Sequence, residues 1–147
     1  MAEFVPLGSD ERILDTMIQL ARATKAHRVI VAGSSAFDIY LGLLQRGFSR
    51  TVTTVTCRIP CGQHDVALVS GDHSVTALER LLARVVPFLN SRATLAVWVS
   101  AQEHGSGRKL QLLLERLGFR IEAGAKCENG VVLSAQRREW SQIAKAA

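Results

Sequence analysis

Hydrophobic positions along the chain follow two alternating patterns. Apolar residues spaced three to four apart lie on one face of a helix, whereas short runs rich in Val and Ile are typical of strands buried on both faces. The first pattern predicts helices over residues 9–25, 35–46, 74–86 and 110–117. The second predicts strands over residues 28–32, 51–56, 65–69, 94–99, 119–123 and 131–135.

Local signals set the ends of these elements. We expect Ser9 or Asp10 to cap the first helix, because a short side-chain acceptor satisfies N–H groups that the first turn leaves free. Ser74 is expected to cap the third helix in the same way. Gly47 and Gly118 stand where the second and fourth helices should end.

The predicted elements imply one α/β domain. Strands that alternate with helices form a largely parallel sheet with right-handed crossovers and helices on both faces. Asn129-Gly130 favours a tight hairpin turn, so the last two strands should be antiparallel. We therefore expect a Rossmann-like, doubly wound domain over residues 1–147. Its expected parts are a helical segment at 9–26, a sheet core at 28–136 with an edge strand at 51–56 and a loop at 57–64, and a tail at 137–147.

The layout from Val29 to Gln136 resembles the class I S-adenosylmethionine-dependent methyltransferase fold. Three features carry the resemblance: the strand and glycine turn at Val29–Gly33, the strand Asp65–Val69 before a long helix, and the helix, strand, turn and strand of Leu112–Gln136. The resemblance implies a parallel sheet ending in a reversed hairpin strand, S-adenosylmethionine as cofactor, and methyl transfer to a small acceptor. Only a short loop fits between Cys57 and Asp65, where the family has a helix–strand–helix unit, so we expect a shortened sheet.

The resemblance also implies where the cofactor lies, because ligands of doubly wound sheets bind beyond the carboxyl ends of strands where the strand order reverses. The implied cofactor-binding residues are Gly33, Ser34, Ser35, Ala36, Cys57, Ser70 and Gly71. The loop is degenerate: Ser35 and Phe37 replace the second and third family glycines, and Val31 replaces an acid. The second strand ends at Cys57 without the carboxylate that binds the cofactor ribose in the family. The Phe37 ring is expected to fill the ligand space or to pack into the core.

Asp72 and His73 are the candidate catalytic residues, because they follow a strand at this same edge. A His can act as a general base near neutral pH, and an Asp can orient it. The alternative is that Asp72 and Ser74 compete to cap the next helix. His104 is a weaker candidate for the same edge, and Trp98, inside a strand, is assigned to the core.

The three cysteines are an odd number and are expected to be reduced thiols. Cys57, Cys61 and His64 have a C-x3-C-x2-H spacing, which Cys127 or His73 would complete to four soft ligands for zinc. Paired C-x2-C units are absent from the sequence, so we expect no metal.

The composition, with 48% hydrophobic and 21% charged positions, is typical of a soluble globular domain. No apolar run approaches the roughly 18–20 residues of a membrane helix, and residues 1–9 lack the pattern of a secretory signal. We therefore expect a cytoplasmic protein.

The net charge of the chain is +5, but no run of basic residues is longer than two, and aromatic side chains are not interleaved with the basic residues. Nucleic acid is thus not an expected partner, and nucleotide or nucleic-acid binding is the weakest hypothesis.

Two stronger functional hypotheses remain. The first is methyl transfer from S-adenosylmethionine to a small acceptor. The second is a non-catalytic binding or assembly domain that acts as a homo-oligomer or with a protein partner, because fold alone does not determine activity. Four apolar residues lie outside the predicted elements: Phe4, Val5, Trp140 and Ile143. They are available to the core or to a subunit interface. The edge strand at 51–56 is a second candidate interface.

Overall fold

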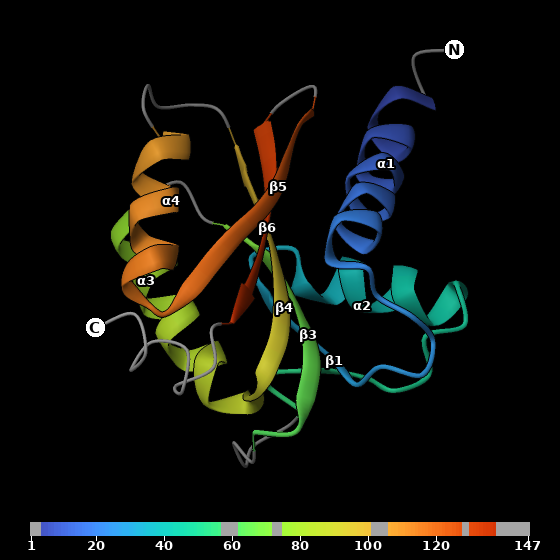
Figure 1. The fold of residues 1–147 in the computed structure, drawn as a ribbon. Helices are drawn as coiled ribbons and strands as arrows, with labels where there is room; N and C mark the ends of the chain where they lie inside the picture. The colour runs from blue at the N-terminus through green and yellow to red at the C-terminus, as the bar shows by residue number, and fades with distance from the viewer. Residues whose placement is uncertain (1–3, 57–61, 72–74, 101–105, 128–129, 138–147) are drawn as a thin grey trace.

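The computed structural model describes residues 4–56, 62–71, 75–100, 106–127 and 130–137. They form a six-stranded sheet with helices on both faces (Figure 1). In chain order the elements are α1 (Phe4–Ala21), β1 (Val29–Gly33), α2 (Ala36–Gln45), β2 (Thr51–Thr53), β3 (His64–Ser70), α3 (Val75–Val85), the 3-10 turn η1 (Val86–Phe88), β4 (Leu89–Ser100), α4 (Ser106–Arg116), β5 (Phe119–Cys127) and β6 (Gly130–Arg137).

The strands are arranged in the order β2-β1-β3-β4-β6-β5. The first four are parallel, and β6 runs antiparallel to both β4 and β5. The predicted Rossmann-like sheet with a closing antiparallel hairpin is therefore confirmed, with β2 at its edge. The chain passes from β1 outward to β2 and then returns to β3 on the other side of β1, so the strand order reverses between β1 and β3.

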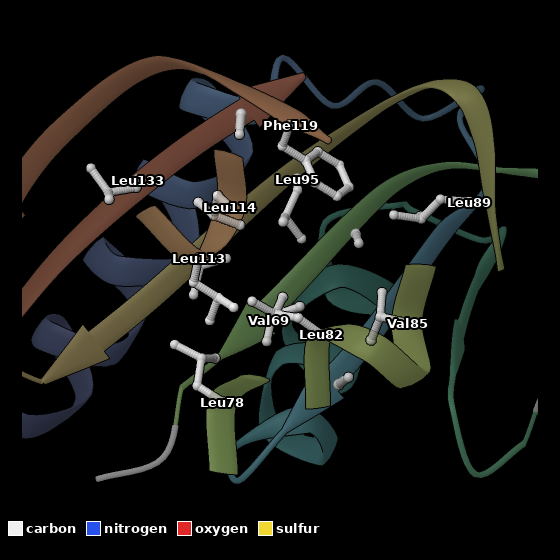
Figure 2. Close-up of a cluster of buried hydrophobic side chains, with 14 of the residues drawn as sticks. Val69, Leu78, Leu82, Val85, Leu89, Leu95, Leu113, Leu114, Phe119 and Leu133 are labelled. Carbon is white, nitrogen blue, oxygen red and sulfur yellow. The ribbon is translucent and has the colours of Figure 1, made fainter. Parts of the chain in front are cut away.

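Alternating side chains of the central strands supply two separate apolar cores. Val29 and Val31 of β1 pack under α1 and α2, whereas Ile30 and Ala32 pack under α3 and α4. The second core is the larger, and Figure 2 shows its leucines meeting Val69 and Phe119. Each fully buried aliphatic side chain of this kind contributes about 1.5–3 kcal/mol, so both helix layers contribute to the stability of the sheet.

The ends of α1 differ from the sequence expectation. The helix begins at Phe4, so Ser9 and Asp10 lie inside it and do not cap it, and Phe4 and Val5 are not outside the regular elements. Pro6 permits this start, because the N–H that proline lacks would have no acceptor in a first turn. The helix ends at Ala21, where the next residue adopts a positive φ, and does not reach Lys25. Trp140 and Ile143 lie outside the described residues.

The edge strand is shorter than expected. β2 ends at Thr53, because the backbone N–H of Thr53 donates to Thr56 Oγ1 and turns the chain away from the sheet. The loop expected at 57–64 is shorter too, since His64 already belongs to β3. Gly47 and Gly118 follow α2 and α4 with φ of +88° and +92°, which confirms the predicted helix ends.

Asp65 joins the amino ends of three strands. Its Oδ2 accepts the Arg28 N–H before β1 at 2.8 Å, and its Oδ1 accepts Asn90 Nδ2 of β4 at 2.9 Å. This carboxylate lies at the opposite end of the sheet from the strand ends that make the candidate site. In the described part of the chain, no helix combines the length and apolar character needed to cross a bilayer.

Candidate functional site

The carboxyl ends of the parallel strands β1, β3 and β4 lie side by side at one end of the sheet. The register places Gly33 opposite Ser70 and Ser70 opposite Trp98, so β1 and β3 end together and β4 continues two residues further, to Ser100. Because the strand order reverses between β1 and β3, their following connections diverge and leave a crevice here.

Ser70 fills the space next to the β1–α2 turn. A Cβ on Gly33 would overlap the Ser70 carbonyl and hydroxyl oxygens, and Gly33 has a φ of +112°, so only glycine fits at this position. The Ser35 N–H donates to Ser70 Oγ at 2.9 Å. Ser70 is 1% exposed, so its hydroxyl is a fixed part of the turn.

The structure brings together six of the seven cofactor-binding residues implied by the resemblance. Gly33, Ser34, Ser35 and Ala36 connect β1 to α2, and Ser70 and Gly71 end β3 beside them. The Gly71 N–H donates to the Trp98 carbonyl at 2.6 Å, which ties this end of β3 to β4. Cys57, the seventh residue, lies outside the described residues. So do the catalytic candidates Asp72 and His73, together with His104.

A cavity of about 120 Å³ opens at this edge, between α1, α2 and the sheet. Its lining is Ile13, Leu14 and Met17 of α1, Asp38 and Ile39 of α2, and Ser35, Ser70 and Trp98 at the strand ends. Small-molecule sites typically combine an apolar wall with a few polar groups, and this lining has that character.

Sequence reasoning missed most of these lining residues. Ile13, Leu14 and Met17 form the apolar stripe of α1, and a stripe that walls a cavity has the same spacing as one that only packs on a sheet. Trp98 packs against the core as expected, but it is only half-buried and also lines the cavity. Asp38 is an acid in the first turn of α2, a position that sequence alone explains by helix stability.

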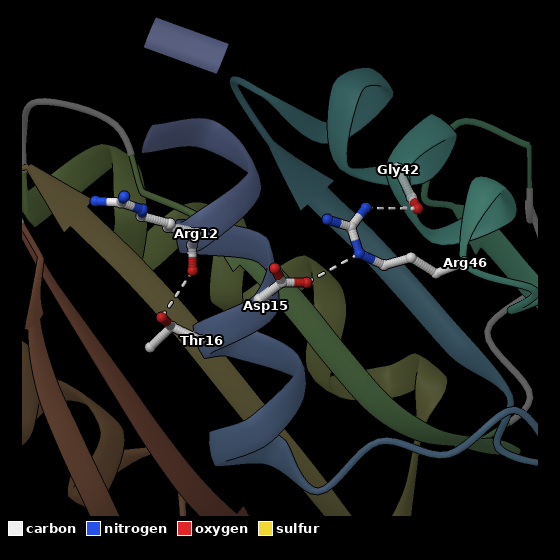
Figure 3. A network of polar contacts seen from close by, with 5 residues as sticks. All are labelled: Arg12, Asp15, Thr16, Gly42 and Arg46. Atoms are coloured by element: carbon white, nitrogen blue, oxygen red, sulfur yellow. Dashed lines mark hydrogen bonds and ion pairs between the residues drawn. The ribbon is translucent and has the colours of Figure 1, made fainter. Parts of the chain in front are cut away.

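One polar network fixes α1 over α2 and so shapes the cavity (Figure 3). Arg46 Nε donates to Asp15 Oδ1 at 3.0 Å, and one of its terminal nitrogens donates to the Gly42 carbonyl at 3.0 Å. The Asp15 side chain is 62% exposed, so the ion pair adds orientation more than stability.

Two polar groups of the cavity lining lack partners among the described residues. Trp98 Nε1 is buried without an acceptor. The Asp38 carboxylate is exposed at the rim, and it has neither a hydrogen bond nor an ion pair within the described ranges. Ser35 is the N-cap of α2 but its side chain makes no capping bond, so Asp38 is not part of a reciprocal cap.

The Phe37 ring was expected to fill the ligand space or to pack into the core, and it does neither. Its side chain is 66% exposed, does not line the cavity, and stacks on Tyr40 with ring centroids 6.5 Å apart. The prediction that this ring fills ligand space or packs into the core is therefore wrong. Phe37 is the second residue of α2 and lies on the solvent-exposed side of that helix, whose buried residues are Ile39 and Leu43.

His64 has a structural partner. Its ring is buried at 7% exposure, and Nδ1 donates to the Phe88 carbonyl at 3.1 Å. Within the described ranges, no three His, Cys, Asp or Glu side chains gather as a metal site requires. Cys57 and Cys61 lie outside those ranges, and of Cys127 only the backbone is described.

Known structures share this architecture. The chain has the class I methyltransferase-like fold, with six strands, mostly parallel, and an antiparallel C-terminal hairpin. It is similar to a SAM-dependent methyltransferase from Aquifex aeolicus, with a TM-score of 0.62, 12% identity, and coverage of 86% of this chain and 88% of the other. No family model matches the chain, and no curated protein matches it.

Two further structures show how widely the fold is used. A Burkholderia thailandensis 1,6-didemethyltoxoflavin-N1-methyltransferase, solved with bound S-adenosylhomocysteine, matches with a TM-score of 0.59, 16% identity, and coverage of 90% of this chain and 81% of the other. The [4+2]-cyclase SpnF matches with a TM-score of 0.63, 11% identity, and coverage of 88% and 82%. Similar structures thus carry the names of different reactions, so the function of this chain must be argued from its own site.

The residues at the strand ends do not fit S-adenosylmethionine in the way that the family pattern implies. Val31, in place of the family acid, is fully buried in β1. The sequence has no Asp or Glu between Asp38 and Asp65, so the end of β2 offers no carboxylate for a ribose. The Ser35 N–H, which a ligand would otherwise meet, is bonded to Ser70.

Proposed function

We propose that this chain is a ligand-binding domain with the methyltransferase fold, and that its ligand is a molecule smaller than S-adenosylmethionine. The ligand occupies the cavity between α1, α2 and the ends of β3 and β4. The observation that carries the proposal is the Ser70 hydroxyl, which fills the space beside Gly33 and bonds the Ser35 N–H. The cavity of about 120 Å³ also suits a small molecule, since a 150 Å³ cavity in another protein is known to bind benzene.

The test is titration of the full chain with S-adenosylmethionine and with S-adenosylhomocysteine. A ligand at one hundred times its Kd stabilises a protein by about 2.7 kcal/mol. For a chain of this size that is a rise in Tm of about 5–10 °C. We expect no rise with either compound at about 1 mM. A rise of several degrees, matched by saturable heat in calorimetry, would overturn the proposal.

The second candidate function is methyl transfer from S-adenosylmethionine to a small acceptor. Two observations support it: the cavity lies at the reversal of strand order, and the chain's fold matches methyltransferases such as the one solved with S-adenosylhomocysteine. In that case Gly33–Ala36, Ser70 and Gly71 would contact the cofactor, which supplies the methyl group, and Asp72 and His73 would be the candidates for the acceptor side. The same titration separates the two functions.

We also propose that the chain associates with a second copy of itself through the α2–β2 edge. Phe37, Leu41 and Leu44 form an exposed apolar stripe along α2, at 66%, 41% and 39% exposure. Helix α2 packs beside β2, which has no strand on its outer side among the described residues. An unpaired ladder next to an apolar surface is a favourable pairing surface.

A further inference from the structure

We propose that the cavity binds a small organic cation, an aliphatic amine in its ammonium form. This inference rests on the proposed function and names the chemical class of its ligand. It starts from the charge of the lining: Asp38 is its one ionisable residue, and no Lys, Arg or His lines it in the described part of the chain. The lining therefore carries a negative charge, although the net charge of the whole chain is +5.

Asp38 is free to bind such a ligand. Its carboxylate is exposed at the rim of the cavity, and it has no hydrogen bond or ion pair with any described residue. By contrast, the Asp15 carboxylate of α1 is already paired with Arg46. An ammonium group at the cavity rim would therefore meet an unpaired charge, to which it can donate charge-assisted hydrogen bonds.

The remaining lining suits the carbon body of the ligand. Ile13, Leu14 and Met17 provide an apolar wall from α1, and Ile39 closes the α2 side. Trp98 adds an indole, the aromatic group that attracts a nearby cation most strongly. The cavity of about 120 Å³ limits the body to a short branched or cyclic alkyl group.

Three compounds with one carbon skeleton test the charge preference: 3-methylbutylamine, 3-methylbutanol and 3-methylbutanoate. The readout is the indole N–H signal of Trp98 in a ¹H–¹⁵N spectrum, identified with Trp98→Phe. The sequence has two Trp residues, so two indole signals are expected. We expect the amine to shift the Trp98 signal saturably, with an affinity about fivefold tighter than that of the alcohol. The carboxylate should produce no shift at about ten times the concentration of the amine.

Asp38→Asn removes the charge while keeping the shape of the side chain. We expect it to bring the amine and the alcohol to equal affinity. The matched control is Glu115→Gln, which removes an exposed acid from α4 on the opposite face of the sheet and should preserve the fivefold preference. Equal binding of the amine and the alcohol by the unmodified chain, or a preference that survives Asp38→Asn, would overturn the inference.

The outcomes separate this inference from the proposed function. Saturable binding of S-adenosylmethionine overturns the proposed function, whatever the amine does. Equal affinity for amine and alcohol overturns only the cation preference, because a small ligand still enters the cavity. A Trp98 signal that moves with none of the three compounds overturns the cation site directly.

Discussion

Gly33 and Ser70 lie opposite each other in the β1–β3 register, and each explains the other's identity. Glycine is required because Ser70 occupies the space of its missing Cβ, and the Ser70 hydroxyl is needed because it accepts the Ser35 N–H. This pair decides whether the turn after β1 is open to a ligand or closed by the protein itself.

Gly33→Ala should be among the most destabilising substitutions at this edge. The new Cβ would overlap the Ser70 backbone and hydroxyl at a positive φ, so we expect a loss of about 3 kcal/mol or more in the free energy of unfolding. The measurement is urea denaturation followed by circular dichroism. The control is Gly118→Ala: Gly118 also has a positive φ but no atom near its added Cβ, and should cost about 1 kcal/mol. Equal losses in the two variants would contradict the steric account.

Ser70→Ala should cost about 1–2 kcal/mol, because it leaves the Ser35 N–H without its acceptor in a partly buried position. Ser134 is as deeply buried, but its hydroxyl makes only a 3.5 Å contact with the Ala123 carbonyl. Ser134→Ala should therefore cost less than about 1 kcal/mol. Chemical denaturation of both variants tests the difference, and a larger loss in Ser134→Ala would reject it.

Asp65→Ala should destabilise the chain by about 2 kcal/mol, because it removes acceptors that join β1 and β4 to β3. Asp15→Ala removes an exposed ion pair with Arg46 and should cost less than about 1 kcal/mol. The two variants can be compared by thermal unfolding. If Asp15→Ala is the more damaging change, the network that joins α1 to α2 matters more than the one that joins the strands.

The double variant Phe37→Ser, Leu41→Ser should abolish self-association and leave the fold intact. Light scattering coupled to gel filtration should give a dimer for the unmodified chain and a monomer for the variant. Leu112→Ser is the control, since Leu112 is 53% exposed but lies on α4, away from the α2–β2 edge. A monomeric unmodified chain, or a monomer produced by Leu112→Ser, would refute the proposed interface.

The sequence pattern predicted the sheet well, because strand and helix periods alternate clearly from Val29 onward. It placed the ends of α1 wrongly, since Ser9 and Asp10 have the chemistry of a cap wherever they occur. It extended β2 to Thr56, because Thr and Val have the same strand preference in a turn as in a ladder.

The candidate site was only half predictable. The glycine turn and Ser70 follow from the position of two strand ends, which the pattern gives directly. The rest of the cavity comes from α1, and no local signal indicates which part of the sheet an N-terminal helix will cover. Asp38 could have been singled out only with knowledge that its carboxylate has no partner in the helix.

The docking of α1 has a consequence for the synthesis of the chain. Met17 of α1 packs into the same core as Ala96 of β4 and Val132 of β6, which leave the ribosome roughly 80 and 115 residues later. At about 5–20 residues per second, the last part of the surface that buries this face of α1 is synthesised roughly 6–23 s after Met17. Until β6 has been synthesised, the apolar face that Ile13, Leu14 and Met17 form on α1 lacks part of the surface that buries it in the folded chain.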